Sequence, residues 1–303
     1  MSKLSSNDIA YMETNHPHLY ILTPCYGNQC TLNYMTCLIS TLEALPKWGI
    51  EVNVKFCKND SLITRARNNL LAMAMATPST THIMFIDSDI SWTPYDIVKL
   101  IVSNKALIGG IYPLKKYHWH KMVDGKDKGE DEEADADADG KHTLKVNDQV
   151  RKESTIQSLI SQKADNNLLS SMTDESIMRC NLVKYNVNYL NNTMTIANNI
   201  AAVRHIPTGF MMIQRRTIEL LHESSPHSKY VDDVGLLSDT ENHFAYALFN
   251  CAVEGGHYMS EDWYFCNRWA DLGGEVHIDI SINLTHTGIE DYVGCYTSSI
   301  VVT

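Results

Sequence analysis

Short apolar runs alternate with amphipathic stretches through the first third of the chain. The apolar run 83–86 leads directly into Asp87-Ser88-Asp89. Runs of this kind are typical of buried strands in a parallel sheet. They are separated by segments in which apolar residues recur every three or four positions, a spacing that predicts helices. The alternation of strands and helices predicts βαβ units.

The predicted elements of this half are bounded by proline and glycine. We expect strands at 19–23, 50–56 and 82–86, and helices that end before Pro46 and Pro78. In the second of these helices, apolar side chains are expected to face the core and polar ones to face elsewhere. The expected inward set is Leu62, Ile63, Ala66, Leu70, Met73 and Ala74, and the polar set is Arg65, Arg67 and Asn68.

Polar stretches flank and interrupt this pattern. Residues 1–17 are expected to form a loosely held lead-in. Residues 118–180 are rich in Lys, Asp, Glu, Ser and Asn, so we expect an insertion that is partly flexible. Within it, the Ala-Asp alternation at 134–139 is interpreted as a solvated acidic loop. Helical character returns near 156–160.

The apolar pattern resumes after the insertion. We expect strands at 210–213, 244–253 and 276–278. A helix is expected from Glu261 to Leu272, because acids favour the first turn of a helix and Gly273-Gly274 follows its last turn.

These elements predict a single α/β domain with a Rossmann-like, mostly parallel sheet flanked by helices. A chain of 303 residues with 44% hydrophobic content is long enough for one large domain or two small ones. The predicted segments are 1–18, 19–117, the polar insertion 118–180, and 181–303.

Charge and cysteine usage narrow the class of partner and compartment. The formal net charge of −11 argues against a nucleic-acid surface, although the run 130–139 supplies part of it. None of the 8 cysteines forms a Cys-x-x-Cys pair, so a zinc knuckle is not indicated and we expect reduced thiols. The sequence shows no signal peptide and no transmembrane segment, which favours a cytoplasmic or intracellular protein.

The carboxylates of Asp87 and Asp89 are the first candidate for chemistry. Two neighbouring carboxylates repel unless a cation lies between them, and Mg²⁺ or Mn²⁺ prefers oxygen ligands and also binds phosphates. Open α/β sheets bind ligands beyond the carboxyl ends of their strands, where this pair is expected. The alternative is a simple turn before the helix that begins near Pro94.

Other candidates have two interpretations each. Glu261 and Asp262 either stabilise a helix start or include a general base. His286 is either structural or a metal ligand. Arg65 and Arg67 point to different faces of one helix, so at most one is expected at a phosphate site.

No Gly-x-Gly-x-x-Gly, Walker or Gly-x-Ser-x-Gly motif is present, which disfavours dehydrogenases, P-loop enzymes and α/β-hydrolases.

Five short segments, taken in their order along the chain, favour one interpretation of these candidate residues. They are Phe-Ile-Asp-Ser-Asp, Gly-Gly-x-Tyr-Pro, Pro-Thr-Gly-Phe-Met, Ser-Glu-Asp-Trp-Tyr-Phe-Cys-x-Arg and Leu-Thr-His-Thr-Gly. In this order the chain resembles nucleotide-sugar glycosyltransferases with the GT-A fold, roughly over 19–115 and 200–290. Asp-x-Asp alone is short and common, whereas the Glu-Asp helix and the late His-x-Gly are more specific.

The resemblance assigns roles to individual residues. Asp87 and Asp89 match the motif that holds Mn²⁺ or Mg²⁺ with the diphosphate, and His286 matches a C-terminal metal ligand. Glu261 and Asp262 match the acidic pair that includes the base of inverting members, and Asp262 is our choice. The implied nucleotide-sugar contacts are Thr23, Pro24, Tyr26, Arg65, Asp87, Ser88, Asp89 and Gly110. The implied acceptor contacts are Gly209, Phe210 and Trp263.

The expected activity is metal-dependent transfer of a sugar from a nucleoside-diphosphate sugar, most often a UDP-sugar, to a glycan or glycoprotein acceptor. Segment 19–117 would bind the nucleotide sugar, and segment 181–303 would bind the acceptor and catalyse. A sugar-phosphate nucleotidyltransferase is one alternative, although the loop after the first strand lacks the basic residue that class needs. A non-catalytic sugar-nucleotide or glycan-binding module is the other.

Overall fold

The chain is an α/β protein, as its alternating pattern predicts. The computed structural model describes residues 4–119, 142–145, 163, 170–191 and 193–300. The chain divides into two compact units: Met1–Gly109 with His205–Val276, and Gly110–Arg204 with His277–Thr303. Both the Ala-Asp run at 134–139 and the expected helical segment at 156–160 lie outside the described residues.

The first unit is built on a mixed sheet in which most strands share one direction. Its strands, in spatial order, are β2 (Glu51–Lys58), β1 (His18–Cys25), β3 (His82–Ile86), β11 (Phe210–Gln214) and β5 (Leu107–Gly109). β1 is parallel to β2 and β3, whereas β11 is antiparallel to β3 and β5. It follows that β2, β1, β3 and β5 run in the same direction and that only β11 opposes them.

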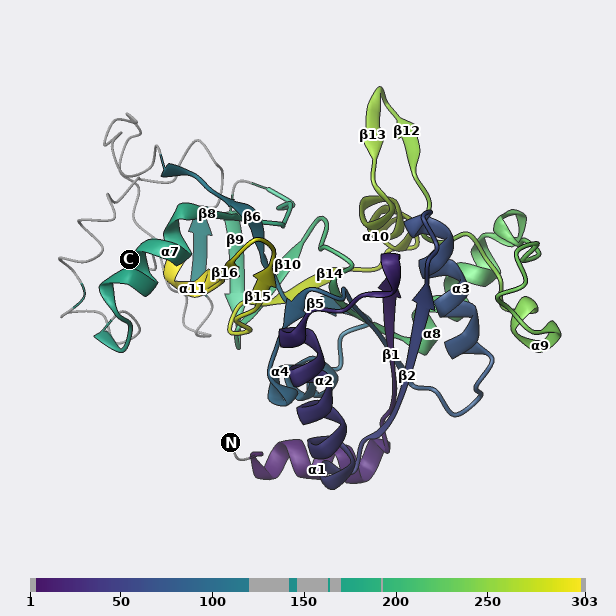
Figure 1. The fold of residues 1–303 in the computed structure, drawn as a ribbon, viewed down its shortest axis with the longest axis horizontal. Helices are drawn as coiled ribbons and strands as arrows, with labels where there is room; N and C mark the ends of the chain where they lie inside the picture. Colours follow the sequence, from purple (N-terminus) through teal and green to yellow (C-terminus); the bar gives the residue numbers. More distant parts are fainter. Residues whose placement is uncertain (1–3, 120–141, 146–162, 164–169, 192, 301–303) are drawn as a thin grey trace. The chain divides into compact units, whose positions relative to one another are not determined.

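Helices cover both faces of this sheet. They are α1 (Ser6–Asn15), α2 (Leu32–Ala44), α3 (Ile63–Met75), α4 (Pro94–Val102), α8 (Arg215–Ser224), α9 (Asp239–Asn242) and α10 (Glu261–Asp271). In Figure 1, α2 and α4 lie on one side of β1 and β2, and α3 and α8 lie on the other. Every residue of β3 is buried, as expected for a strand covered on both faces.

Shorter elements complete the first unit. They are the 3₁₀ helices η1 (Tyr26–Asn28), η2 (Pro46–Trp48) and η5 (Pro226–Ser228), the short strand β4 (Ile90–Ser91), and the hairpin β12 (Ala252–Glu254) with β13 (His257–Met259). The hairpin projects beside α10 in Figure 1.

The N-terminal residues do not form the loose lead-in expected from their polarity. Ser6–Asn15 form α1, which begins with a capping box between Ser5 and Asp8. The side chain of Met12 is buried, and the Tyr95 hydroxyl of α4 donates to Asp8 over 3.3 Å. A helix with few apolar residues is held here by its cap and by the buried side chains of Asp8 and Met12.

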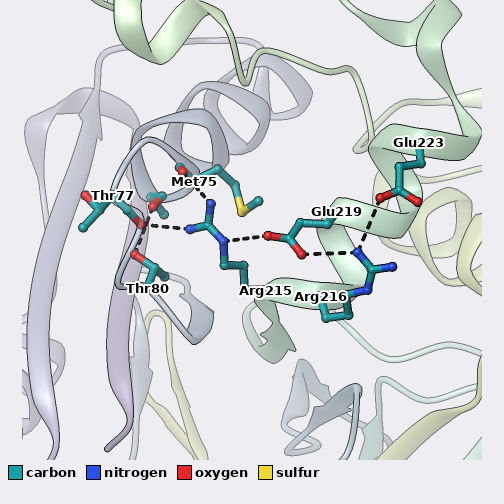
Figure 2. A network of polar contacts seen from close by, with 8 residues as sticks. Met75, Thr77, Thr80, Arg215, Arg216, Glu219 and Glu223 are labelled. Carbon is teal, nitrogen blue, oxygen red and sulfur yellow. Dashed lines mark hydrogen bonds and ion pairs between the residues drawn. The ribbon is translucent and has the colours of Figure 1, made fainter.

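Arg215 joins the start of α8 to the end of α3, as Figure 2 shows. Its guanidinium donates to the carbonyl oxygens of Met75 and Thr77, at 3.1 and 2.8 Å. The last carbonyls of a helix have no partner within the helix, so a cation at this end satisfies them and favours the helix dipole. Glu219 accepts from Arg215 Nε over 2.9 Å and so fixes the guanidinium.

The strand expected at 244–253 is wrong. Residues after α9 run irregularly, and strand structure returns only at β12. Ala245, Leu248 and Phe249 of this segment are nevertheless buried, whereas Val253 is 70% exposed. Apart from a single bridge between Lys229 and Tyr246, these side chains are buried without a sheet partner within the described residues, which explains an apolar run that resembles a strand in sequence.

The second unit contains shorter elements. Its strands are β6 (Pro113–Tyr117), β7 (His142–Lys145), β8 (Val183–Tyr185), β9 (Thr193–Ala197), β10 (Ile200–Val203), β14 (Val276–Asp279), β15 (Thr285–Thr287) and β16 (Asp291–Val293). Its helices, among the residues that the structure describes, are α7 (Asp174–Leu182) and α11 (Tyr296–Ser299). β7, β9 and β10 are consecutive antiparallel neighbours, as are β6 with β8 and β15 with β16. In the described part of the chain, no helix combines the length and apolarity needed to cross a membrane.

Candidate functional site

Asp87, Ser88 and Asp89 form the turn that follows β3, as the sequence predicts. The amide of Asp87 donates to Gly209 O at 3.0 Å, and Asp87 O accepts from the amide of Ile90 at 3.1 Å. Asp87, Ser88 and Asp89 are partly exposed, whereas the strand before them is buried. The carboxylates therefore stand at the carboxyl edge of the sheet, where ligands of α/β proteins bind.

Arg67 of α3 joins this turn to the start of α10. Its Nη2 lies 3.1 Å from Asp87 Oδ1, and its Nε lies 3.2 Å from Glu261 Oε1. The Arg67 side chain is only 5% exposed, and its guanidinium also lies 5.6 Å from the centroid of the Phe85 ring. A buried cation needs charged partners, and here two carboxylates share it.

Arg65 has a different partner. Its guanidinium binds Asp60 through two hydrogen bonds of 2.8 Å, and these bonds lower the pKa of the Asp60 carboxyl. The spacing of the two arginines predicts that at most one of them reaches the site, and the resemblance assigns this role to Arg65. In the structure Arg67 is the arginine that contacts Asp87, so a diphosphate contact by Arg65 stays a prediction.

The inward and outward faces expected for α3 are wrong at several positions. Leu62, just before the helix, and Ile63 are exposed, whereas Arg67, Asn68 and Asn69 are buried. The reason is that each of these polar side chains has a specific polar partner: Asp87 and Glu261 for Arg67, the Phe249 backbone for Asn68, and Asp232 for Asn69. Three consecutive polar residues inside an amphipathic helix were the available sequence signal.

Asn68 and Asn69 fix two chain segments against α3. Asn68 Nδ2 donates to Phe249 O at 2.8 Å, and its Oδ1 accepts from the Phe249 amide at 2.9 Å. Asn69 Nδ2 donates to Asp232 Oδ1 at 3.3 Å, and Asp232 in turn accepts from the amide of Leu237 at 2.9 Å. The irregular segments before α10 are thus held by α3, beside the residue that contacts Asp87.

The first turn of α10 presents Glu261 and Asp262 differently. Glu261 faces Arg67, and its side chain is 15% exposed. Asp262 Oδ1 accepts from the amide of Trp263 at 2.9 Å and from the hydroxyl of Ser260. Asp262 therefore takes part in the helix start, as one of the two sequence interpretations expected, and remains partly exposed.

Trp263 lies on the next position of α10. Its ring stacks on His205 with centroids 4.9 Å apart and an interplanar angle of 9°. His205 Nε2 lies 2.8 Å from Asn267 Oδ1, so this nitrogen carries a proton and the imidazole is held in place. Trp263 is partly exposed.

The residues expected around the nucleotide are spread along β1 and the loop after it. Thr23 is buried, and its hydroxyl lies 2.5 Å from that of Tyr34, a contact within the core. Pro24 is partly exposed, and Tyr26 is 75% exposed. Because β1 and β3 are parallel neighbours, this loop and the Asp87 turn leave the sheet at the same edge.

Cys25 ends β1 beside the Asp87 turn. Burial, the thiol of Cys30 and nearby charges that include Asp87 raise the pKa of Cys25 to about 12. The thiol is therefore protonated near neutral pH. All eight cysteines are free thiols in the structure.

Gly109 and Gly209 both make close backbone contacts with a neighbouring segment of the chain. A Cβ at Gly109 would lie 2.6 Å from Phe210 O, so the close approach of β5 and β11 requires glycine there. Gly209 accepts from the Asp87 amide, whereas Phe210 is buried in the core. Phe210 lies in register with Ile86, the last residue of β3.

Two predicted site residues, Gly110 and His286, belong to the second unit. His286 Nδ1 lies 2.9 Å from Pro113 O, and its ring lies 5.0 Å from that of Tyr112. A carbonyl can only accept, so Nδ1 carries the proton. Metal-binding histidines commonly donate to a backbone carbonyl in this way. Among the described residues, no group of three or more His, Cys, Asp or Glu side chains is arranged to hold a metal ion.

The chain has a distant structural likeness to solved structures. No protein-family model matches the sequence, and no curated protein matches it. Solved structures that resemble the chain include one described as the crystal structure of A197 from STIV. It has 13% sequence identity and a TM-score of 0.41, over 90% of this chain and 86% of that chain. At this level of similarity, the likeness says nothing about what this chain binds.

Proposed function

We propose that the protein is a metal-dependent glycosyltransferase that moves a sugar from a nucleoside-diphosphate sugar to an acceptor hydroxyl. One observation carries this proposal: Arg67 contacts both the Asp-Ser-Asp turn and the acidic start of α10, through Asp87 and Glu261. These two segments are far apart in sequence, and they are the two that the resemblance assigns to donor and base. Their proximity supports assigning them to one site.

The donor set of the turn fits a hard divalent cation. Asp87 and Asp89 offer carboxylate oxygens on one loop, which is the ligand chemistry that Mg²⁺ and Mn²⁺ prefer. Arg67 contacts Oδ1 of Asp87, and a carboxylate has lone pairs enough for a second partner. A cation held there would neutralise the charge that develops on the departing diphosphate.

The chain's own residues would supply the remaining steps. Arg67 keeps the Asp87 turn and Glu261 at a fixed separation, so the donor and base sides stay aligned. As the glycosidic bond to the diphosphate breaks, the sugar carbon becomes oxocarbenium-like and an acceptor hydroxyl attacks it. Asp262 would accept the acceptor's proton if the anomeric configuration inverts, because its partly exposed carboxylate is oriented by the Trp263 amide.

The stacked pair of Trp263 and His205 supports an acceptor role for this end of α10. A rigid aromatic face beside a candidate base gives apolar area on which the C–H face of a sugar can lie. We therefore propose a glycan or a glycoprotein glycan as acceptor, and a UDP-sugar as the first donor to test. Eight free thiols fit the intracellular location that we propose.

The test is a panel of nucleoside-diphosphate sugars, each with and without Mn²⁺, scored for release of nucleoside diphosphate. Metal-dependent release from one donor is expected, with water replacing the acceptor slowly. Asp89→Ala should abolish the release, whereas Asp239→Ala at the start of α9 is a matched control that should leave it unchanged.

Three results would contradict the proposal or part of it. Donor binding without release, even with an acceptor panel, would indicate a binding module. Release of pyrophosphate from a sugar phosphate and a nucleoside triphosphate would indicate a nucleotidyltransferase. Full activity in Asp262→Asn would remove Asp262 from the role of base.

A further inference from the structure

Two cysteines lie against each other at the loop that follows β1. Cys25 is the last residue of the strand, and Cys30 precedes Thr31, the N-cap of α2. Their sulfur atoms are 3.4 Å apart. Cys25 is 4% exposed, whereas Cys30 is partly exposed. One cysteine is thus fixed in the sheet, and the other is a partly exposed residue of the loop.

The loop between them is shaped so that the two thiols meet. Gly27 and Asn28 have φ angles of 70° and 60°, in the left-handed region that glycine and asparagine tolerate best. Two successive residues of this kind turn the chain back on itself within five positions. This turn lies between the two cysteines whose sulfur atoms are in contact.

The residue after Cys30 is bonded to the candidate site. Thr31 donates to the carbonyl oxygen of Ser88 twice, from its amide over 2.9 Å and from its hydroxyl over 3.2 Å. Ser88 lies between Asp87 and Asp89. A displacement of Cys30 is therefore transmitted to the turn that carries both carboxylates through one intervening residue.

From this geometry we infer that Cys25 and Cys30 form a reversible disulfide that takes a low-molecular-weight disulfide as its oxidant and alters the Asp87–Asp89 turn. A disulfide bond is about 2.05 Å long, so closing it brings the sulfurs about 1.4 Å closer. Cys25 is held by β1, so Cys30 moves and draws Thr31 away from Ser88. The inferred disulfide does not need the proposed function, but its effect on donor binding rests on it.

The chemistry is thiol–disulfide exchange in two steps. The Cys30 thiolate attacks one sulfur of the oxidant, which forms a mixed disulfide and releases one thiolate. Cys25 then loses its proton to solvent and attacks Cys30 Sγ, which releases the second half of the oxidant as thiolate. Two protein thiols are oxidised, one disulfide molecule is reduced to two thiols, and a reducing dithiol reverses the exchange.

Cys57 provides an internal alternative for the pairing. It lies on β2, where Pro24 of β1 is its register partner, and it is buried. Parallel strands hold such neighbours at a fixed spacing, and its burial leaves it less accessible than Cys30. The experiment must therefore distinguish a pairing of Cys25 with Cys30 from one with Cys57.

The test treats the folded full-length protein with oxidised glutathione and maps its peptides by mass without reduction. The peptide that holds both Cys25 and Cys30 is expected to lose the mass of two hydrogen atoms and to regain it with dithiothreitol. Cys30→Ser should abolish this change, and Cys30→Ala is the second variant if the first does not fold. Cys37→Ser and Cys57→Ser are matched controls that should keep it.

Hydrogen exchange then tests the link to the turn without any assay of activity. Oxidation should speed exchange of the Thr31 amide in the wild-type protein and leave it unchanged in Cys30→Ser. Donor binding, measured separately with a UDP-sugar and Mn²⁺, should weaken several-fold on oxidation. Absence of binding in both redox forms would count against the proposed function alone.

Two outcomes would overturn the inference. One is that Cys25 and Cys30 stay reduced or that Cys25 pairs with Cys57 instead. The other is that the disulfide forms while Thr31 exchange is unchanged, which would leave the bond without effect on the Asp87–Asp89 turn.

Discussion

At the scale of single residues, Arg67 has the most consequential environment in the described chain. Its one positive charge is shared by Asp87 and Glu261, and all three side chains are mostly removed from water. Buried charges are tolerated only while they are balanced. The position is therefore expected to be sensitive both to loss of the charge and to its exact shape.

We predict that Arg67→Met lowers the free energy of unfolding by about 3 kcal/mol, because two carboxylates are left facing each other. Urea unfolding of the variant and the wild-type protein at neutral pH measures the loss. Arg216→Met, at an exposed arginine that pairs with Glu219 and Glu223 (Figure 2), is the control and should cost less than about 1 kcal/mol. Equal losses in the two variants would contradict this account of Arg67.

A buried histidine should make the stability of the protein depend on pH. Burial lowers the pKa of His82 to about 4 from its ordinary value of 6.5, and its Nε2 has no hydrogen-bond partner within the described residues. Between these two values the unfolded chain binds more protons than the folded one, so stability falls as pH falls through that window. Above it, the contribution of His82 is fully present.

We predict that His82 alone accounts for a loss of about 2–3 kcal/mol between about pH 7 and pH 4.5. The variant His82→Phe keeps a ring in the strand but cannot take a proton, so its stability should fall less over the same range. Burial also lowers the pKa of His222 to about 4, so part of the slope will remain. Identical slopes for wild type and His82→Phe would show that His82 does not titrate as expected.

At the scale of elements, α2 shows how far sequence spacing can be trusted. The spacing of Leu32, Met35, Leu38, Ile39 and Leu42 predicts the helix correctly, but only Leu38 of these five side chains is buried, and Leu32 is 81% exposed. Leu38 shares the buried face with Tyr34 and Thr41. Two of these three are polar, and each hydroxyl has a partner, Thr23 or Trp92.

We predict that Leu38→Ala costs about 2–4 kcal/mol of unfolding free energy, because it leaves a cavity in a packed core. Ile39→Ala, one position further along the same helix, should cost less than about 1 kcal/mol because its side chain already contacts water. Thermal or urea unfolding of the pair is the measurement. A larger loss for Ile39→Ala would mean that another surface covers the exposed face.

The buried polar side chains of α3 show why part of the candidate site could not be predicted from the sequence. Sequence spacing identified the helix, the strand before Asp87 and the acidic start of α10, because local apolar patterns determine them. The partner of Asn68 is the backbone of Phe249, which no local pattern specifies. That Arg67 contacts Asp87 while Arg65 contacts Asp60 likewise could not be predicted from local spacing.

At the scale of the whole molecule, the predicted site residues fall into two compact units that each take separate stretches of the sequence. Asp87, Asp89, Glu261 and Asp262 belong to the first unit, and His286 belongs to the second. The α/β class followed from the alternation of strands and helices. The division into units did not, because it depends on contacts between distant parts of the chain.

A ligand that binds the folded protein alone raises its stability, so binding can be measured without knowing the acceptor. We predict that Mn²⁺ with a matching UDP-sugar stabilises the wild-type protein by about 3 kcal/mol at a hundredfold excess over its dissociation constant. Asp89→Ala should abolish this gain because it removes an expected metal ligand. Asp239→Ala is the matched control and should retain the gain.

The variant His286→Ala tests separately whether His286, the metal ligand that the resemblance implies, binds the metal. The exposed His257→Ala is its control. Loss of the metal-dependent gain in His286→Ala but not in His257→Ala would support His286 as a ligand. If His286→Ala keeps the full metal-dependent gain in stability, His286 is not a metal ligand. The expected ligands are then the carboxylates of the Asp87–Asp89 turn. A full gain in Asp89→Ala would be more serious, because Asp89 is the ligand on which the proposed metal site depends.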